Sequence, residues 1–130
     1  MRQSLNVVYR LAAEEFTRRV LSSLRDQIEA IVLYGSTARG EAKRFSDIDI
    51  LVISPDPPAV KDQISEIRSD LTYERNFSFL ISLIHLSPEE FGEQMRQGSP
   101  LIDDVIAQGV ILYDRGTFSR IREEATAVGR

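Results

Sequence analysis

The chain has 130 residues, which is enough for one domain with a single hydrophobic core. Its 20 acidic and 16 basic side chains give a formal net charge of −4, so no global positive field exists to collect nucleic acid, and nucleic acid is not an expected partner. The absence of cysteine excludes thiolate chemistry. No apolar run approaches the roughly 20 residues that span a bilayer, so we expect a cytoplasmic protein with no membrane partner.

The first predicted element is a long amphipathic helix over about residues 4–26, where apolar residues recur at helical spacing with charged residues between them. The short apolar run 31–34 then predicts a buried strand that stops at Gly35. A second strand is predicted over 47–53, because aliphatic and β-branched residues there lead into a proline-rich turn.

After the prolines, apolar residues from Val60 to Leu71 step by four, three and four positions, which predicts a helix against one face of the sheet. Residues 77–86 predict a third, longer strand. Ser87 is followed by a proline and, three positions on, by a glutamate, a capping-box pattern that predicts a helix through about Gln97.

Three further elements complete the expected order. Ser99 begins a short helix that Gly109 is placed to end, and residues 110–113 form a last strand. Thr117 is expected to cap a C-terminal helix over about 117–126 whose tail frays from the alanine at position 125. The inward-facing side chains of the short helix are expected to be Leu101, Ile102, Val105 and Ile106. Alternating strands and helices predict a single α/β or α+β domain over residues 1–130.

The segment from Gly35 to Asp49 carries the predicted chemistry. Gly35 removes a side chain where backbone must approach a ligand, and Ser36 adds a hydroxyl donor at a possible helix start that suits a triphosphate. Asp47 and Asp49 point to the same face of a strand, about 7 Å apart, because successive side chains alternate. Two carboxylates facing one site are the hard oxygen ligands that Mg²⁺ prefers beside phosphates.

Either half of this segment alone is common, since Gly-Ser is a frequent turn and Asp-x-Asp often only begins a strand. Together, Gly35-Ser36-(ten residues)-Asp47-Ile48-Asp49 resembles the signature of the DNA polymerase beta-like nucleotidyltransferase superfamily. The chain looks most like the minimal nucleotidyltransferase (MNT) proteins, many of which pair with HEPN-domain toxins. The resemblance covers about residues 20–115 and implies a small mixed sheet flanked by helices.

By that resemblance, Gly35 and Ser36 hold the phosphates of ATP, while Asp47 and Asp49 bind Mg²⁺ and are catalytic. Arg39 is a nucleotide-binding candidate on the strength of the resemblance alone. The family reaction transfers a nucleoside monophosphate, here expected to be AMP, to an acceptor hydroxyl. A chain of this size leaves no room for a separate acceptor-binding domain, so the acceptor site is expected to involve a HEPN-type partner protein or a second copy of the chain.

The sequence departs from the family pattern in one place. A third carboxylate usually lies on a neighbouring strand, yet the expected strand, with Asn76 just before it, contains no acid. Ser78 and Ser82 share one face of this strand, so either is a candidate for the place of the missing carboxylate, and Glu74 is the nearest acid before the strand. The alternative to an enzyme is therefore a nucleotide-binding antitoxin module that neutralises a partner by binding, and nucleic-acid polymerisation is the least favoured reading because no basic template-binding segment exists.

Other titratable residues are expected to be structural. His85 is the only histidine and lies among apolar neighbours at a strand end, with no companion that would make it a metal ligand. Glu89 and Glu90 fall in the first turn of a predicted helix, where capping and the helix dipole account for them.

Overall fold

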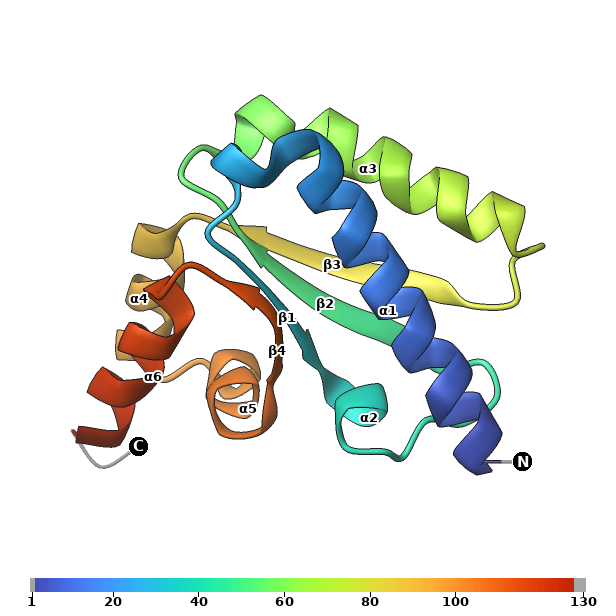
Figure 1. The fold of residues 1–130 in the computed structure, drawn as a ribbon. Coiled ribbons are helices and arrows are strands. Elements are labelled where there is room, and N and C mark those ends of the chain that lie inside the picture. The colour runs from blue at the N-terminus through green and yellow to red at the C-terminus, as the bar shows by residue number, and fades with distance from the viewer. Residues whose placement is uncertain (1, 128–130) are drawn as a thin grey trace.

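The computed structural model describes residues 2–127 and builds them around one four-stranded sheet (Figure 1). Strands and helices alternate along the chain, as the sequence predicts. The strands are β1 (Ala30–Tyr34), β2 (Asp47–Ile53), β3 (Leu80–Leu86) and β4 (Val110–Asp114). The helices are α1 (Arg2–Leu24), followed by a 3-10 turn η1 (Arg25–Gln27), α2 (Gly35–Ala38), α3 (Pro57–Glu74), α4 (Pro88–Arg96), α5 (Pro100–Gln108) and α6 (Thr117–Ala127).

The sheet is mixed, with the strand order β3-β2-β1-β4. β1 pairs antiparallel with both β2 and β4, whereas β2 and β3 run parallel. A parallel pair needs a crossover connection, and α3 supplies it between β2 and β3. This arrangement confirms the predicted fold class, a small mixed sheet flanked by helices.

Helices cover both faces of the sheet, and the alternation of side chains along each strand gives each face its own core. On one face, Ile48, Ile50 and Val52 of β2 pack with residues of α1 and α3. On the other face, Leu51 and Ile53 pack with residues of α4, α5 and α6. Figure 1 shows α1 and α3 on one side of the sheet and the three C-terminal helices on the other. Within residues 2–127 no helix is long and apolar enough to cross a membrane.

The third strand is shorter than predicted, because it begins at Leu80 and not at Phe77. Asn76 and Phe77 both have positive φ angles, 55° and 56°, which no strand residue adopts. Their amide groups donate to carbonyls of the last turn of α3, those of Tyr73 and Thr72. The turn that closes the C-terminal end of α3 therefore includes residues that strand propensity alone assigned to β3.

The cap of α6 also differs from the prediction. The carboxylate of Asp114, at the end of β4, accepts hydrogen bonds from the amides of Phe118 and Ser119 at 3.1 and 2.9 Å. Thr117 does not cap the helix, since its hydroxyl donates to the Glu29 carboxylate at 3.1 Å. An acid three residues upstream thus satisfies the free amides that the threonine was expected to satisfy.

Two predictions about side-chain exposure are wrong as well. Leu101 is 43% exposed. Successive residues of a helix are about 100° apart, so Leu101 lies to the side of the inward face, which begins at Ile102. Ala125 is fully buried and α6 continues to Ala127, so the helix does not fray where expected; residues 128–130 lie outside the described part of the chain. The inward face of α5 consists of Ile102, Val105 and Ile106.

Candidate active site

Gly35 directly follows β1 and is the first residue of the single turn of α2. Its φ is +75°, a conformation that side chains disfavour. A Cβ added there would also overlap the carboxylate of Asp49. Position 35 therefore needs glycine for two independent reasons, and the second one brings the Gly-Ser turn into contact with the Asp-x-Asp strand. Ser36, next in the turn, is half-buried.

The two carboxylates of β2 lie on the same face of the strand as Leu51 and Ile53, which pack against α5. Asp47 is exposed and Asp49 is half-buried. Burial raises the pKa of Asp49, and the neighbouring charge of Asp47 raises it further. Neither carboxylate accepts a hydrogen bond from any residue in the described part of the chain. Both carboxylates are thus without a hydrogen-bond donor among the described residues.

Tyr34 and Asp104 also reach this site, although neither was predicted as a site residue. Tyr34 is the register partner of Asp49 across β1 and β2, and it is only 5% exposed. Burial, then the charges of Asp49 and Asp104, raise the pKa of the Tyr34 hydroxyl to about 12, so it remains a neutral donor. Antiparallel pairing of the two predicted strands could have revealed Tyr34. Asp104 comes from α5, and no local pattern signals its position.

Arg39 lies beside this acidic group. Its guanidinium donates to the Glu41 carboxylate at 2.7 Å and lies 3.8 Å from the Asp104 carboxylate. The hydrogen bond with Glu41 raises the pKa of Arg39, and the charge of Arg39 in turn opposes the upward shift at Asp49. The structure therefore brings Asp104 together with four of the predicted residues, Gly35, Arg39, Asp47 and Asp49, and Arg39 is the cation whose charge acts on Asp49.

The match to known proteins agrees with this geometry. Residues 15–106 match the family described as "Nucleotidyltransferase domain", a span that contains the whole segment from Gly35 to Asp49. The chain belongs to this nucleotidyltransferase family. The predicted family is thereby confirmed, while the individual roles of the site residues remain predictions.

Named relatives and solved structures extend the finding. "Putative protein adenylyltransferase MJ0604" of Methanocaldococcus jannaschii is 45% identical over 102 residues, covering 78% of this chain and 95% of that protein. "Putative protein adenylyltransferase MJ1305" of the same organism is 29% identical over 105 residues, covering 81% and 71%. A toxin–antitoxin crystal structure with AMP-PNP shares the fold at a TM-score of 0.55 and 20% identity, covering 88% of this chain and 85% of that one. The crystal structure of "a putative nucleotidyltransferase from Sulfolobus solfataricus" shares the fold at a TM-score of 0.51 and 22% identity, covering 88% of this chain and 87% of that one.

The third carboxylate of the nucleotidyltransferase pattern has no counterpart on β3. Ser82 is the residue of β3 that pairs with Asp49, whereas Ser78 lies before the strand begins. Glu74 is engaged elsewhere, since both of its oxygens accept hydrogen bonds from Arg19, at 2.8 and 2.9 Å. In the part of the chain that the structure describes, no group of three or more acids, histidines or cysteines could hold a metal ion.

His85 takes a structural position in the nucleotidyltransferase sheet. Its Nε2 atom lies 2.6 Å from the hydroxyl oxygen of Ser54, which is fully buried after the end of β2. Burial lowers the pKa of His85, so the neutral ring is favoured. Glu90 completes a capping box with Ser87, through hydrogen bonds of 2.8 and 3.1 Å, as the sequence predicts.

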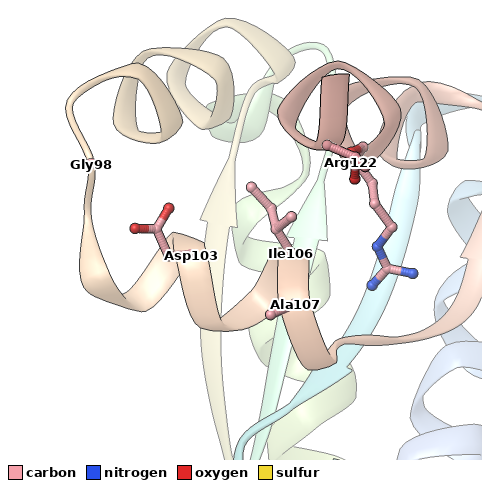
Figure 2. A pocket seen from close by; sticks show the side chains of 6 residues that line it. Gly98, Asp103, Ile106, Ala107 and Arg122 are labelled. Carbon is pink, nitrogen blue, oxygen red and sulfur yellow. The ribbon is translucent and has the colours of Figure 1, made fainter. Parts of the chain in front are cut away.

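A separate pocket of about 640 Å³ lies between α5 and α6 (Figure 2). Its walls come from neither β2 nor α2, so it is distinct from the Asp-x-Asp site. Figure 2 shows Asp103 and Arg122 on opposite sides of Ile106. Arg122 donates to the Gly109 carbonyl at 2.8 Å and lies over the ring of Phe118, 4.7 Å from its centroid. The arginine therefore joins α6 to the end of α5, while its Nε atom is buried without a hydrogen-bond partner among the described residues.

Proposed function

We propose that this chain transfers AMP from ATP to a hydroxyl group of a protein acceptor. The observation that carries the proposal is the close approach of Gly35 to the carboxylate of Asp49, which joins a phosphate-binding turn to a pair of acids. Membership of the nucleotidyltransferase family supports the reaction class. The names of the Methanocaldococcus jannaschii relatives support AMP as the group transferred and protein as the acceptor class.

In this proposal the amide groups of Gly35 and Ser36 bind the triphosphate, and Arg39 contributes positive charge beside it. Asp47 and Asp49 fit a divalent cation, because they share one face and accept no hydrogen bond from the described residues. Burial, and then the charge of Asp47, raise the pKa of Asp49, and a bound cation would favour its charged form. Mg²⁺, when bound, would neutralise phosphate charge and favour departure of pyrophosphate. The Tyr34 hydroxyl would keep its proton and donate a hydrogen bond to the acids or to the phosphates.

The proposed step is a displacement at the α-phosphorus of ATP. The acceptor oxygen forms a new bond to phosphorus, the bond to the bridging oxygen of pyrophosphate breaks, and pyrophosphate leaves with that electron pair. The proton of the acceptor hydroxyl passes to water, because β3 presents Ser82 where a third carboxylate would otherwise lie. The chain's own contribution is to hold the triphosphate, orient the acceptor and exclude alternative positions of both.

The proposed acceptor is a HEPN-type protein, and the site of action is the cytoplasm. Fold neighbours include crystal structures of toxin–antitoxin complexes, which supports a protein partner for this chain. The acid-free β3 strand favours a second candidate function, in which the chain binds ATP but neutralises its partner by occlusion. The two functions differ in whether Asp47 and Asp49 are needed.

The test is to incubate the purified chain with labelled ATP, Mg²⁺ and the protein encoded by the neighbouring gene. Transfer of label to that protein, lost in the Asp47→Asn/Asp49→Asn variant, is the expected result. Neutralisation of the partner by the double variant at wild-type stoichiometry, with no label transferred by either form, would instead establish occlusion.

A further inference from the structure

A groove of about 660 Å³ opens beside Asp47, between the C-terminal end of α3 and the start of β3. Asp47 and Ser82 line it, so the groove is continuous with the candidate active site. Its outer wall carries Tyr73, Phe77 and Leu80. A molecule bound in this groove would therefore have one end next to the first aspartate of the Asp-x-Asp motif.

The outer wall is apolar and exposed to an unusual degree. Tyr73, Phe77 and Leu80 are 73%, 63% and 55% exposed. The two rings touch edge to face, with centroids 6.1 Å apart, so they present one joint surface. Adjacent exposed aromatic and aliphatic side chains mark binding surfaces, because aromatic residues provide much of the energy of protein–protein contacts.

The charge of the groove argues against the triphosphate as its occupant. Asp47 and Asp70 line it together with a single cation, Arg68, which leaves the lining net negative. Phosphates would be repelled there, whereas at the Gly35 turn, which contacts Asp49, the charge of Arg39 favours them. The same negative charge disfavours a nucleic acid acceptor.

β3 adds a second recognition element at the groove. It is an edge strand, paired only with β2 within the described residues, and its sequence Leu-Ile-Ser-Leu-Ile-His-Leu contains no charged residue and no proline. Edge strands without such protection can pair with an extended segment of another protein. An added strand would run past Leu80 and Ser82, the residues of β3 that lie beside Asp47 and Asp49.

We propose that this groove is the acceptor site, and that it holds an extended, apolar or aromatic segment of a protein acceptor with no net negative charge. The inference rests on the proposed function and specifies where its second substrate binds. Backbone pairing with β3 positions the segment, Tyr73, Phe77 and Leu80 bind its apolar side chains, and the hydroxyl to be modified lies next to Asp47.

The test compares Tyr73→Ala/Phe77→Ala and Leu80→Ala with a matched control, Ile111→Ala. Ile111 is 40% exposed on β4, the opposite edge strand, and lies outside the groove. Three quantities are measured for each form: the KM for the neighbouring gene's protein in the transfer assay, the affinity of that protein without nucleotide, and the affinity for MgATP. The groove variants should raise the KM and weaken binding of the protein at least about tenfold, while MgATP affinity stays within about twofold and Ile111→Ala resembles wild type.

Each other outcome is decisive. Groove variants that bind and use the protein like wild type would overturn the inference, as would variants that lose MgATP affinity, since the groove would then belong to the nucleotide. If the wild type transfers no AMP, the proposed function fails while the docking site is judged on binding alone: loss of affinity in the groove variants supports it, and unchanged or absent binding refutes it. A wild-type dimer that the groove variants dissociate would identify a second copy of the chain as occupant and also overturn the inference.

Discussion

Two polar pairs lie on or beside strands β2 and β3, near opposite ends of these strands, and they differ in whether their members are hydrogen-bonded. Ser54 and His85 form a hydrogen bond of 2.6 Å with each other, and burial favours the neutral form of the histidine. Asp47 and Asp49 have like charges and accept no hydrogen bond from the described residues. Buried polar groups in stable structures are normally paired, as Ser54 and His85 are, whereas the exposed Asp47 and the half-buried Asp49 have no such partner among the described residues, and we propose that this second pair binds a ligand. The predictions below test this difference.

The largest expected effect is on catalysis, from the double substitution Asp47→Asn/Asp49→Asn. The initial rate of AMP transfer should fall by about a thousandfold or more. The melting temperature should stay the same or rise, because the substitution removes the repulsion and the burial of charge that raise the pKa of Asp49. A marked loss of thermal stability would mean that the acids support the fold, contrary to the contrast drawn above.

Gly35→Ala tests the contact between the turn and the acids. The rate should fall by about a hundredfold, because the new Cβ displaces the Asp49 carboxylate. Stability in chemical denaturation should fall by about 1–2 kcal/mol from the positive φ alone. Gly98→Ala is the control, since Gly98 has a φ of +73° and open space around it. Equal losses of rate in both variants would show that backbone strain, and not the Asp49 contact, matters.

Ser54→Ala examines the hydrogen-bonded pair. It should lower the free energy of unfolding by about 1–3 kcal/mol, because the partly buried ring nitrogen of His85 loses its hydrogen-bond partner. The rate of AMP transfer per folded molecule should be unchanged. A loss of activity without a loss of stability would make this end of the strands functional.

His85 should also give stability a pH dependence. Because burial lowers its pKa in the folded chain below the ordinary 6.5, the unfolded chain binds the proton more readily. The stability that the neutral His85 ring contributes is fully present above pH 6.5, and it is lost as the pH falls below that value toward the pKa of the folded chain. Wild type should therefore lose more stability than His85→Gln between pH 7 and about pH 5, as measured by urea unfolding. Parallel losses in the two proteins would contradict this.

The smallest expected effect comes from Glu74→Gln, at the acid nearest in sequence to the missing carboxylate. Glu74 is exposed and paired with Arg19, so thermal stability should change little and AMP transfer should stay within about twofold of wild type. A loss of transfer comparable to that of the aspartate variants would reinstate Glu74 as the general base.

The contrast between β2 and β3 explains how far the sequence alone could go. β2 was predicted with its observed bounds, because an uninterrupted aliphatic run ends at prolines that cannot continue a ladder. The start of β3 was misplaced because Phe77 favours strands by type, yet its backbone conformation is fixed by the end of α3. Local propensity determined the first boundary and a neighbouring helix determined the second.

The candidate site divides in the same way. Gly35, Asp47 and Asp49 were predictable because their types and spacing encode a turn and one face of a strand. Asp104 was not, since only the packing of α5 brings it within 3.8 Å of Arg39. The engagement of Glu74 by Arg19, 55 positions away, is likewise a tertiary contact that no local pattern signals.

The central claim is that the chain transfers AMP through the site at Gly35, Asp47 and Asp49. It is tested most directly by supplying ATP labelled at either the α- or the γ-phosphate, together with Mg²⁺ and the neighbouring gene's protein. Covalent label on the acceptor from α-labelled ATP alone, with release of labelled pyrophosphate from the γ-labelled form, is the predicted result. Label retained from the γ-phosphate, or α-label transferred equally well by Asp47→Asn/Asp49→Asn, would contradict the claim.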